Sequence, residues 1–460
     1  MTHPYETPYV PPPYPYDLLD ELRSVAQERF GSVIDCSIGA PVDPPTPAVV
    51  AALSTSNLER GYPPSVGTPG YREAAARWLQ RLTGVDVDPA TQIGAAVGTK
   101  EFVAMTPHFL RMRMPHRDTI LYPEVSYPSY EQGAIFSGCR AVPVAVDDRW
   151  RIDLDAIDPA DAARALCLWI NSPGNPAGGI DDLAAAAAWG RANDVLVLSD
   201  ECYIEFTWDG PPQSILQSGV DGVLAVHSLS KRSNFAGARA GFYAGDPDLV
   251  QYLKEVRKHG GLIVSGPVQA AAIVAFDDQT HVEEQRKVYL QRLEIGIELL
   301  RAAGAAVEMP GGGFYLWAEA PAHDSWALAR VLAERSGVIV SPGEFYGRRT
   351  DYVRFAASSP PLTCSSRSNE CAAERSNHGR GVGPAVGPSA GQRAIACRTW
   401  LTLRSRRRLI CKPASRRSGP TATQSMPTIP RSWEPSPRQS MHSTRAWRES
   451  PSGMQMAPSP

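Results

Sequence analysis

The sequence predicts an α/β protein with a large domain, built on a mostly parallel sheet covered by helices, and a smaller α+β domain. Two observations carry this prediction. Short apolar runs rich in β-formers alternate with longer helical patterns such as DDLAAAAAWGRA, and nearly continuous apolar strands are typical of buried parallel sheets. In addition, polar residues that could bind a ligand or take part in catalysis follow several of these runs directly, as expected where ligands bind at the carboxyl ends of parallel strands. The runs are IGAAV (93–97), TILY (119–122), LCLWI (166–170), VLVLS (195–199) and VLAVH (223–227).

The 460 residues, 43% hydrophobic and 20% charged, are enough to bury a large core. We expect an extended, proline-rich N-terminal arm over residues 1–30, the large domain over 31–262 and the small domain over 263–357. No apolar run approaches the roughly 20 residues that span a bilayer. The start of the chain also lacks a basic segment followed by an apolar one. A cytoplasmic location without a membrane partner is therefore expected.

Cysteine spacing and the missing nucleotide motifs exclude several classes of protein. The eight cysteines include no CxxC pair, which argues against a zinc ribbon or a disulfide scaffold, and no metal site is predicted. Cys202 and the other cysteines of the first 357 residues are interpreted as core residues. The chain contains neither GxGxxG nor GxxxxGK[ST], so dinucleotide-binding and P-loop functions lose their main support.

The composition changes after Ala357. Residues 1–357 hold 30 Lys and Arg against 44 Asp and Glu, whereas 358–460 hold 16 against 4. This segment is rich in Ser, Arg, Pro and Gly without sustained apolar periodicity, and it is predicted to be a disordered tail. Back-translation of SSPPLTCSSRSNEC with GC-rich codons, read two bases later, gives an amphipathic helix. We interpret the tail as a frameshift product, with a nucleic-acid or localisation patch at RSRRR (404–408) as the alternative.

The stretch HSLSKRSNFAGAR (227–239) follows an apolar run and contains a lysine beside two serines and an arginine. Lysine after a strand is commonly a solvated loop residue. Ser228, Ser230 and Arg239, however, offer hydroxyls and a guanidinium suited to a dianionic phosphate. A lysine held among positive charges in a partly buried site is a good nucleophile toward carbonyls. The pattern around Lys231 therefore suggests an aldehyde cofactor that carries a phosphate, of which pyridoxal phosphate is the obvious candidate.

An acid, a phenol and an amide occur where such a cofactor needs them. A protonated pyridine nitrogen requires a carboxylate partner, and Asp200 follows the run VLVLS. Tyr203 can reach the 3-oxygen of the ring, and Asn175 lies in the turn NSPGNPAGG after another run. Taken singly, Asp200 could be a helix cap and Asn175 a turn residue. Their joint occurrence at strand ends favours the cofactor interpretation.

Three further segments suit the same ligand. In AAVGTKE a run passes through glycine into a predicted helix, so backbone N–H groups near Thr99 and Lys100 could bind phosphate. Tyr127 of YPEVSYPSYEQ is the candidate to stack on the pyridine ring, whereas Tyr122 and Tyr130 are interpreted as packing residues. Arg354, in DYVRFA, could bind a substrate α-carboxylate or could form a structural salt bridge.

Several stretches taken together resemble the fold-type I, class I pyridoxal-phosphate aminotransferases. They are IGAPVDPPTP, GYPPSVGTPGYREA, GTKE, NSPGNPAGG, SDECY, HSLSKRSNFAGARAGF and YVRFA, within residues from about 30 to 357. LAVHSLSK, SDECYIEFTWD and VRKHGG with GPVQAA are most similar to the N-succinyl-LL-diaminopimelate aminotransferases of high-GC bacteria, which act in lysine biosynthesis. After Ala357 the family continues into a helix that closes the small domain, and that helix is missing from this sequence.

The resemblance implies a role for each matching residue. Lys231 would bind the cofactor covalently and carry the proton between substrate and cofactor, Asp200 would pair with the ring nitrogen, and Tyr203 and Asn175 would bind the 3-oxygen. Gly39 would lie against the substrate and Arg354 would bind its α-carboxylate. The cofactor phosphate would be bound by Ser228, Arg239, Thr99 and Lys100. The protein would be a homodimer, in which Tyr62 of the partner subunit also binds this phosphate.

The resulting functional prediction is a ping-pong transamination between an amino donor, glutamate being preferred, and a 2-oxo acid. The pair N-succinyl-LL-2,6-diaminopimelate and 2-oxoglutarate is the favoured substrate assignment. Aspartate aminotransferase, another class I aminotransferase and a C–S lyase remain open within the same fold. An inactive product of a damaged gene is the alternative from a different class. No nucleic-acid partner is expected, because no DNA-binding module fits before the large domain.

Overall fold

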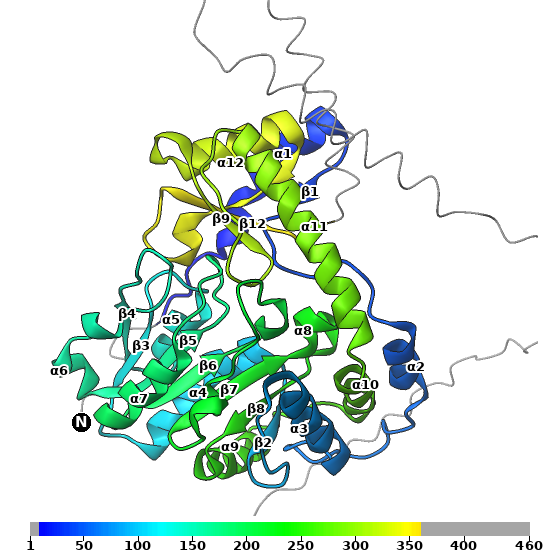
Figure 1. Cartoon of the computed structure of the whole chain (residues 1–460), viewed down its shortest axis with the longest axis vertical. Helices are drawn as coiled ribbons and strands as arrows, with labels where there is room; N and C mark the ends of the chain where they lie inside the picture. The colour runs from blue at the N-terminus through cyan, green and yellow to red at the C-terminus, as the bar shows by residue number, and fades with distance from the viewer. Residues whose placement is uncertain (1–8, 360–460) are drawn as a thin grey trace, which may run out of the picture. The chain divides into compact units, whose positions relative to one another are not determined.

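The computed structural model describes residues 9–359, and its largest sheet has seven strands (Figure 1). Five of them run parallel to their neighbours from β7 to β4, while β8 is antiparallel to both β7 and β2. In spatial order the strands are β2 (Ile93–Ala96), β8 (Gly241–Gly245), β7 (Val223–Ser228), β6 (Leu196–Asp200), β5 (Ala165–Asn171), β3 (Thr119–Pro123) and β4 (Arg140–Val144).

Helices cover both faces of this sheet, as expected for parallel strands that alternate their side chains between two cores. Val197 packs into one core and Leu198 into the other. The first core is closed by α2 (Pro47–Thr55), α3 (Pro69–Thr83), α7 (Leu183–Asn193) and α10 (Gly266–Asp277). The second is closed by α4 (Thr99–Arg113), α5 (Ser129–Phe136) and α9 (Pro247–His259).

All five strands predicted from apolar runs are present, and the α/β fold class is confirmed. The strands β4 and β8 were not predicted. The edge strand β4 contains Pro143, and β8 has the sequence GFYAG, whose glycines are depleted in strands. Gly241 of β8 is required by packing, since a Cβ there would lie 2.3 Å from the carbonyl oxygen of His227.

A second, antiparallel sheet has the order β11 (Ser341–Pro342), β12 (Tyr352–Ala356), β9 (Tyr315–Glu319). It packs with α11 (Thr280–Ala302) and α12 (Ser325–Ser336) in a third core. In Figure 1 the long helix α11 runs from this sheet to α10 beside the large sheet. The shorter elements are η2 (Leu154–Ala156), α6 (Pro159–Ala162), η3 (Ile204–Phe206), η4 (Ile215–Ser218), α8 (Leu229–Arg232), η5 (Ala236–Ala238), η6 (Pro321–His323), β10 (Val338–Ile339) and η7 (Gly343–Tyr346).

The N-terminal segment differs from the predicted extended arm. Residues 15–30 form η1 (Pro15–Leu19) and α1 (Asp20–Phe30), and β1 (Ile34–Asp35) pairs in parallel with β10. Leu22 and Ala26 of α1 are buried in the core of the second sheet, and Gly31 ends the helix with a φ of 67°. The expectation of an extended arm is therefore wrong for residues 15–30. Periodic apolar residues there outweigh the proline-rich start.

At the other end, the described structure continues past Ala357. Ser358 is 1% exposed, and its hydroxyl donates to the carbonyl of Ile38 at 3.0 Å. The Ser359 hydroxyl donates to the carbonyl of Asp35 at 2.7 Å. These two residues therefore belong to the packed structure and not to the tail. The predicted disorder and frameshift of the remaining tail fall on residues 360–460, outside the described residues, and the domain limits at 31 and 263 stay predictions.

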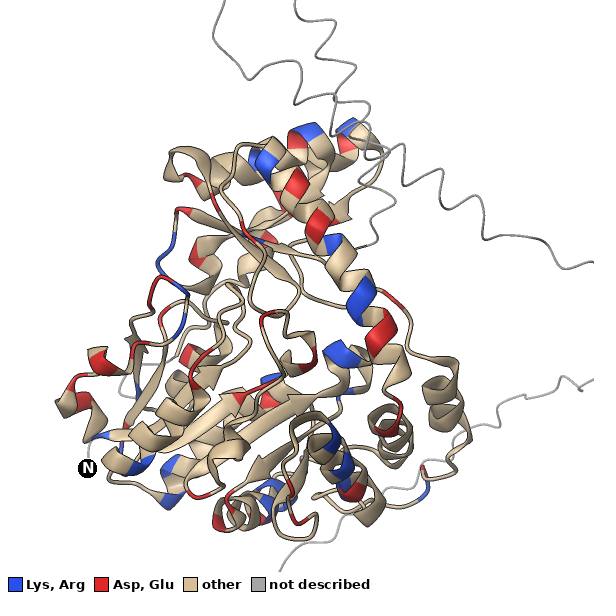
Figure 2. Cartoon of the chain, viewed as in Figure 1, with Lys and Arg blue, Asp and Glu red and all other residues tan. Residues whose placement is uncertain are grey.

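The surface of the described part carries charges of both signs. Along α11, Lys and Arg alternate with Asp and Glu, as Figure 2 shows. Among the helices of residues 9–359, we find none with the length and apolar character required to cross a bilayer.

Gly296 on α11 gives a test of how tightly the helix packs on the small sheet. A Cβ at this position would lie 2.7 Å from a ring carbon of Phe355 and 2.8 Å from a methyl of Leu316. Overpacking of this kind costs about 1–3 kcal/mol, whereas alanine contributes about 1 kcal/mol over glycine in a helix. We expect Gly296→Ala to lower the free energy of unfolding by about 1 kcal/mol in denaturant titrations.

Gly70 on α3 is the matched control, since a Cβ there would only touch Ile273, at an ordinary 3.5 Å. Gly70→Ala should raise the free energy of unfolding by about 0.5 kcal/mol. Equal stabilisation by both substitutions would contradict the described packing of α11.

Candidate active site

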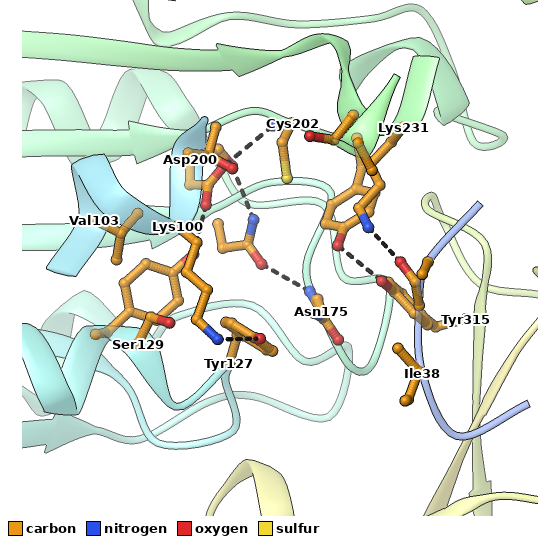
Figure 3. Close-up of a pocket in the computed structure, with 18 of the residues that line it drawn as sticks. Ile38, Lys100, Val103, Tyr127, Ser129, Asn175, Asp200, Cys202, Lys231 and Tyr315 are labelled. Atoms are coloured by element: carbon orange, nitrogen blue, oxygen red, sulfur yellow. Dashed lines mark hydrogen bonds between the residues drawn. The ribbon is translucent and has the colours of Figure 1, made fainter. Parts of the chain in front are cut away.

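A pocket of about 400 Å³ lies where the carboxyl ends of the large sheet's parallel strands meet the small sheet (Figure 3). This is the edge at which ligands bind in open α/β sheets, and the volume falls in the range of small-molecule sites. Ten of the twelve predicted site residues line it: Gly39, Thr99, Lys100, Tyr127, Asn175, Asp200, Tyr203, Lys231, Arg239 and Arg354.

Lys231 enters the pocket from the four-residue helix α8, directly after β7. Its Nζ donates to the carbonyl oxygen of Gly39 and lies 5.8 Å from the centre of the Phe314 ring. Burial, and then the charges of Arg354 and Arg239, lower the pKa of Lys231 to about 8. A substantial neutral fraction of this amine is therefore present near neutral pH, which is the form that attacks a carbonyl.

Asp200 stands at the end of β6 and is 7% exposed. Its Oδ1 accepts the N–H of Cys202 at 3.2 Å and its Oδ2 accepts the hydroxyl of Tyr130 at 3.1 Å. Burial raises the pKa of Asp200, and these two hydrogen bonds oppose the rise. A buried carboxylate held in this way is suited to pair with a cationic ring nitrogen.

Anion donors gather at the start of α4. Gly98 precedes the helix with a φ of 77°, and a Cβ there would lie 2.2 Å from Nη2 of Arg239. The N–H groups of Thr99 and Lys100 belong to the first helical turn, where backbone donors have no partner within the helix. Ser230 also lines this part of the pocket. Backbone N–H groups, a hydroxyl and a guanidinium together suit a phosphate.

Arg354 of β12 forms the opposite side of the pocket and is 1% exposed. Its guanidinium lies between the rings of Tyr315 and Tyr346, 4.5 and 4.4 Å from their centres. Nη1 donates to Oδ1 of Asn175 at 2.9 Å, and Nη2 donates to the carbonyl of Ser37. Nε has no hydrogen-bond partner among the described residues, so this buried cation can still donate a hydrogen bond to an anionic ligand.

Phenols also line the pocket. The hydroxyls of Tyr203 and Tyr315 are 2.9 Å apart, and Lys100 Nζ donates to the Tyr127 hydroxyl at 3.2 Å. Gly39 must be a glycine here, since a Cβ would lie 2.1 Å from the hydroxyl oxygen of Tyr315. The pocket can therefore offer stacking and hydrogen bonds to a flat, polar ring.

Two predicted site residues do not line the pocket. Ser228 is buried, and its hydroxyl accepts the N–H of Ser230 at 3.0 Å as the cap of α8. Tyr62 is 98% exposed. The predicted phosphate contact of Ser228 and the contribution of Tyr62 from a partner subunit both stay predictions.

Several pocket residues were not predicted as such. Tyr130 was interpreted as packing, but its hydroxyl reaches Asp200, and Cys202 was interpreted as core, but it lines the pocket. A signal for both was available, since Tyr130 lies three residues after Tyr127 and Cys202 two after Asp200. Tyr14, Tyr16 and Tyr315 come from elements distant in sequence and had no such signal.

The chemical groups that line the pocket fit pyridoxal phosphate. A nucleophilic amine, a buried carboxylate and a phosphate-binding helix start lie in one pocket, and a buried guanidinium faces them. Among residues 9–359, no group of three or more His, Cys, Asp or Glu is placed to hold a metal ion.

This fold and this pocket define a pyridoxal-phosphate-dependent enzyme of fold type I. Residues 32–363 match the family model described as aminotransferase class I and II, and the chain belongs to this family. It is 40% identical to a 4-dedimethylamino-4-oxo-anhydrotetracycline transaminase of Streptomyces rimosus, over 75% of this chain and 94% of that protein. It is 33% identical to an LL-diaminopimelate aminotransferase of Desulforudis audaxviator, over 73% and 88% of the two chains.

Among solved structures, a probable N-succinyldiaminopimelate aminotransferase of Thermus thermophilus matches with a TM-score of 0.71 and 28% identity. The match covers 78% of this chain and 99% of that one.

The lowered pKa of Lys231 predicts how its reaction with pyridoxal phosphate depends on pH. The amine reacts only when neutral, so the initial rate of the absorbance change on adding cofactor to cofactor-free protein should rise up to about pH 8 and level off above about pH 9. The Lys231→Ala variant supplies the background of other lysines. A Lys231 rate that still climbs beyond pH 10 would show an ordinary, solvated amine.

Proposed function

We propose that the chain catalyses reversible transamination between glutamate and a 2-oxo acid, and that in the direction that forms glutamate the preferred pair is N-succinyl-LL-2,6-diaminopimelate as donor and 2-oxoglutarate as acceptor. The convergence of Lys231, Asp200 and Arg354 in one pocket is the observation that carries the proposal. These groups offer a nucleophilic amine, a partner for a protonated ring and an anchor for a carboxylate.

In this proposal the cofactor phosphate binds at the start of α4. The N–H groups of Thr99 and Lys100 and the guanidinium of Arg239 hold it, together with the hydroxyl of Ser228. In a homodimer, Tyr62 of the partner subunit completes this set. The full exposure of Tyr62 in the single chain is compatible with that assignment.

The ring and the reacting proton use the centre of the pocket. Asp200 pairs with the ring nitrogen, Asn175 and Tyr203 donate to the 3-oxygen, and Tyr127 stacks on the ring. Bound pyridoxal phosphate supplies an electron sink for the bonds at the substrate Cα. Lys231 would first hold the cofactor. Once the substrate has displaced it, its Nζ would take the proton from the substrate Cα and return it to the cofactor.

The substrate carboxylate is assigned to Arg354. Its guanidinium is already fixed by two tyrosine rings and by Asn175, so little rotamer freedom is lost on binding. Gly39, whose carbonyl accepts from Lys231, leaves room for the substrate beside the cofactor. Both half-reactions would use this anchor, since both substrates carry an α-carboxylate.

Likeness to a probable N-succinyldiaminopimelate aminotransferase and to an LL-diaminopimelate aminotransferase supports the diaminopimelate assignment. A second candidate has its own support. At 40% identity, the chain is more similar to the anhydrotetracycline transaminase, whose name specifies a ring ketone as acceptor. Amination of a 4-oxo anhydrotetracycline is therefore the alternative specificity to test.

A donor and acceptor screen separates these specificities. The purified enzyme with added cofactor would be offered N-succinyl-LL-diaminopimelate with 2-oxoglutarate, aspartate with 2-oxoglutarate, and glutamate with 4-dedimethylamino-4-oxo-anhydrotetracycline. We expect the first pair to give the highest kcat/KM, followed by glutamate formation. Pyruvate release from a β-substituted amino acid without any acceptor would instead show a C–S lyase.

An inactive product of a damaged gene is the remaining alternative, and the composition change after Ala357 suggests it. The nucleotide sequence of the gene tests the frameshift. If the shift is real, restoring the frame should raise both thermal stability and turnover.

Asp200→Asn tests the ring partner. The amide keeps the size of the side chain, and its oxygen can still accept the N–H of Cys202 while its NH2 donates to the Tyr130 hydroxyl in place of accepting from it, but it cannot stabilise a protonated ring nitrogen. We expect kcat to fall by about 100-fold or more while cofactor affinity, measured by fluorescence titration, changes far less. A turnover close to wild type would remove Asp200 from this role.

Arg354→Lys tests the carboxylate anchor. A point charge replaces a bidentate fork that is stacked between two rings, so KM should rise for both the amino donor and the 2-oxo acceptor. About a 10-fold rise in each is expected. If steady-state kinetics show the effect on one substrate alone, Arg354 is not the common anchor.

A further inference from the structure

The helix α8 directs two consecutive basic side chains, Lys231 and Arg232, to different sides. Consecutive residues of a helix point about 100° apart, so Lys231 faces the pocket while Arg232 faces the core. A four-residue helix has too few internal hydrogen bonds to hold itself in place. Its position, and with it the position of Lys231, must come from contacts outside the helix.

Arg232 supplies several of those contacts. It is 3% exposed, and its Nε donates to Oε1 of Glu205 at 2.6 Å. Nη1 donates to the carbonyl of Ala275 at 2.6 Å, and Nη2 lies 3.4 Å from the carbonyl of Asp278. The guanidinium is thus attached at once to η3 and to the end of α10, two elements that pack around the site from the core side.

Glu205 is equally well fixed. It is 3% exposed, and besides Arg232 it accepts hydrogen bonds from the indole N–H of Trp78 and from Nε2 of Gln279, the latter at 3.2 Å. Gln279 directly precedes α11, the helix that runs to the small sheet. In Figure 1, α8 lies beside α10 and the adjoining end of α11. Arg232 and Glu205 therefore connect the lysine turn to the α10–α11 junction.

A second contact joins the same two parts of the fold. The hydroxyl of Ser233, next to Arg232, lies 2.9 Å from Nε2 of His281, and Nδ1 of that histidine lies 3.0 Å from Asp278. Burial, and then the charge of Arg232, lower the pKa of His281. Of the two residues that follow Lys231, Arg232 is thus bonded to the end of α10 and Ser233 to the start of α11.

We propose that Arg232 and Glu205 are positioning residues that hold Lys231 against the cofactor and balance each other's charge on the core side of the lysine turn. The proposal rests on the assignment of Lys231 as the lysine that binds the cofactor. Neither residue touches the pocket, and both act through the backbone of α8 and through their mutual neutralisation.

Charged groups surround Lys231 on both its pocket side and its core side. From the pocket side, Lys231 is faced by Asp200, Cys202, Arg239 and Arg354. On the core side, the charged groups around the lysine turn are Arg232 and Glu205, Arg286, which donates to the backbone carbonyl of Glu205, and beyond them Asp278 and His281. Removing one member of the pair changes the buried charge behind Lys231 by one unit of known sign.

The experiment is a double-mutant cycle on the cofactor-loaded enzyme with Arg232→Met, Glu205→Gln and the double variant. The absorbance of the cofactor bound to Lys231 is titrated with pH. Arg232→Met leaves an anion, so the transition should move up by about 0.5 to 1 pH unit, and Glu205→Gln leaves a cation, so it should move down by a similar amount. The double variant should titrate as the wild type does.

The kinetic outcome differs from the titration. Arg232→Met and the double variant both lose the bonds to Ala275 and Asp278, so kcat should fall by about 10-fold or more, with KM for glutamate within about twofold. Arg232→Lys keeps the charge and should restore the titration. Arg117→Met is the control for a loss of structural contacts remote from the site. Arg117 donates to Asp194 and to the carbonyl of Ala165, at the amino end of β5 and so opposite the pocket. It should lower thermal stability without moving the titration.

Shifts of equal sign in the two single variants, or none in either, would overturn the proposal. If Arg232→Met does not fold, Glu205→Gln and the double variant still decide the sign. Persistence of the bound-cofactor absorbance in Lys231→Ala would instead contradict the assignment of Lys231, and so would be told apart from failure of the positioning role.

Discussion

The shared direction of β5, β6 and β7 is the constraint on which the site depends. Parallel strands end at one edge of a sheet, so side chains far apart in sequence meet there. The register pairs Asn171 with Asp200 and Asp200 with Val226, two residues before Ser228. The ring partner and the lysine turn are thus placed by the backbone ladder before any side chain makes a contact.

Burial at this edge is costly for each charge, and the structure offsets the cost in different ways. Asp200 receives two hydrogen bonds, Arg354 lies between two aromatic rings, and Arg232 is paired with Glu205. Around Lys231, burial and two arginines outweigh the stabilisation that Cys202 and Asp200 give to its ionised form, so its pKa is lowered. The fold therefore keeps this amine reactive by leaving its charge poorly compensated.

Sequence alone predicted the strands whose apolar runs are continuous and the polar residues that follow them, including Lys231, Asp200 and Asn175. It missed β8 because GFYAG has the glycines of a loop, although those glycines are required by close backbone packing. It missed Tyr16 and Tyr315 because their places in the pocket depend on contacts over hundreds of residues, which no local pattern records. The helix α1 was obscured by the prolines before it, since composition was given more weight than the apolar spacing of Leu22 and Ala26.

The separation in sequence between the two halves of the pocket has a consequence for synthesis. All the proposed phosphate donors of this chain lie between Gly98 and Arg239, around a sheet that is complete once β8 has been made. Arg354, by contrast, must contact Asn175, 179 positions earlier, and Tyr16, 338 positions earlier. Because chains emerge N-terminus first and fold domain by domain, the cofactor half of the pocket can form while the carboxylate anchor is still untranslated. A nascent chain would thus acquire its aldehyde before it could recognise an amino acid.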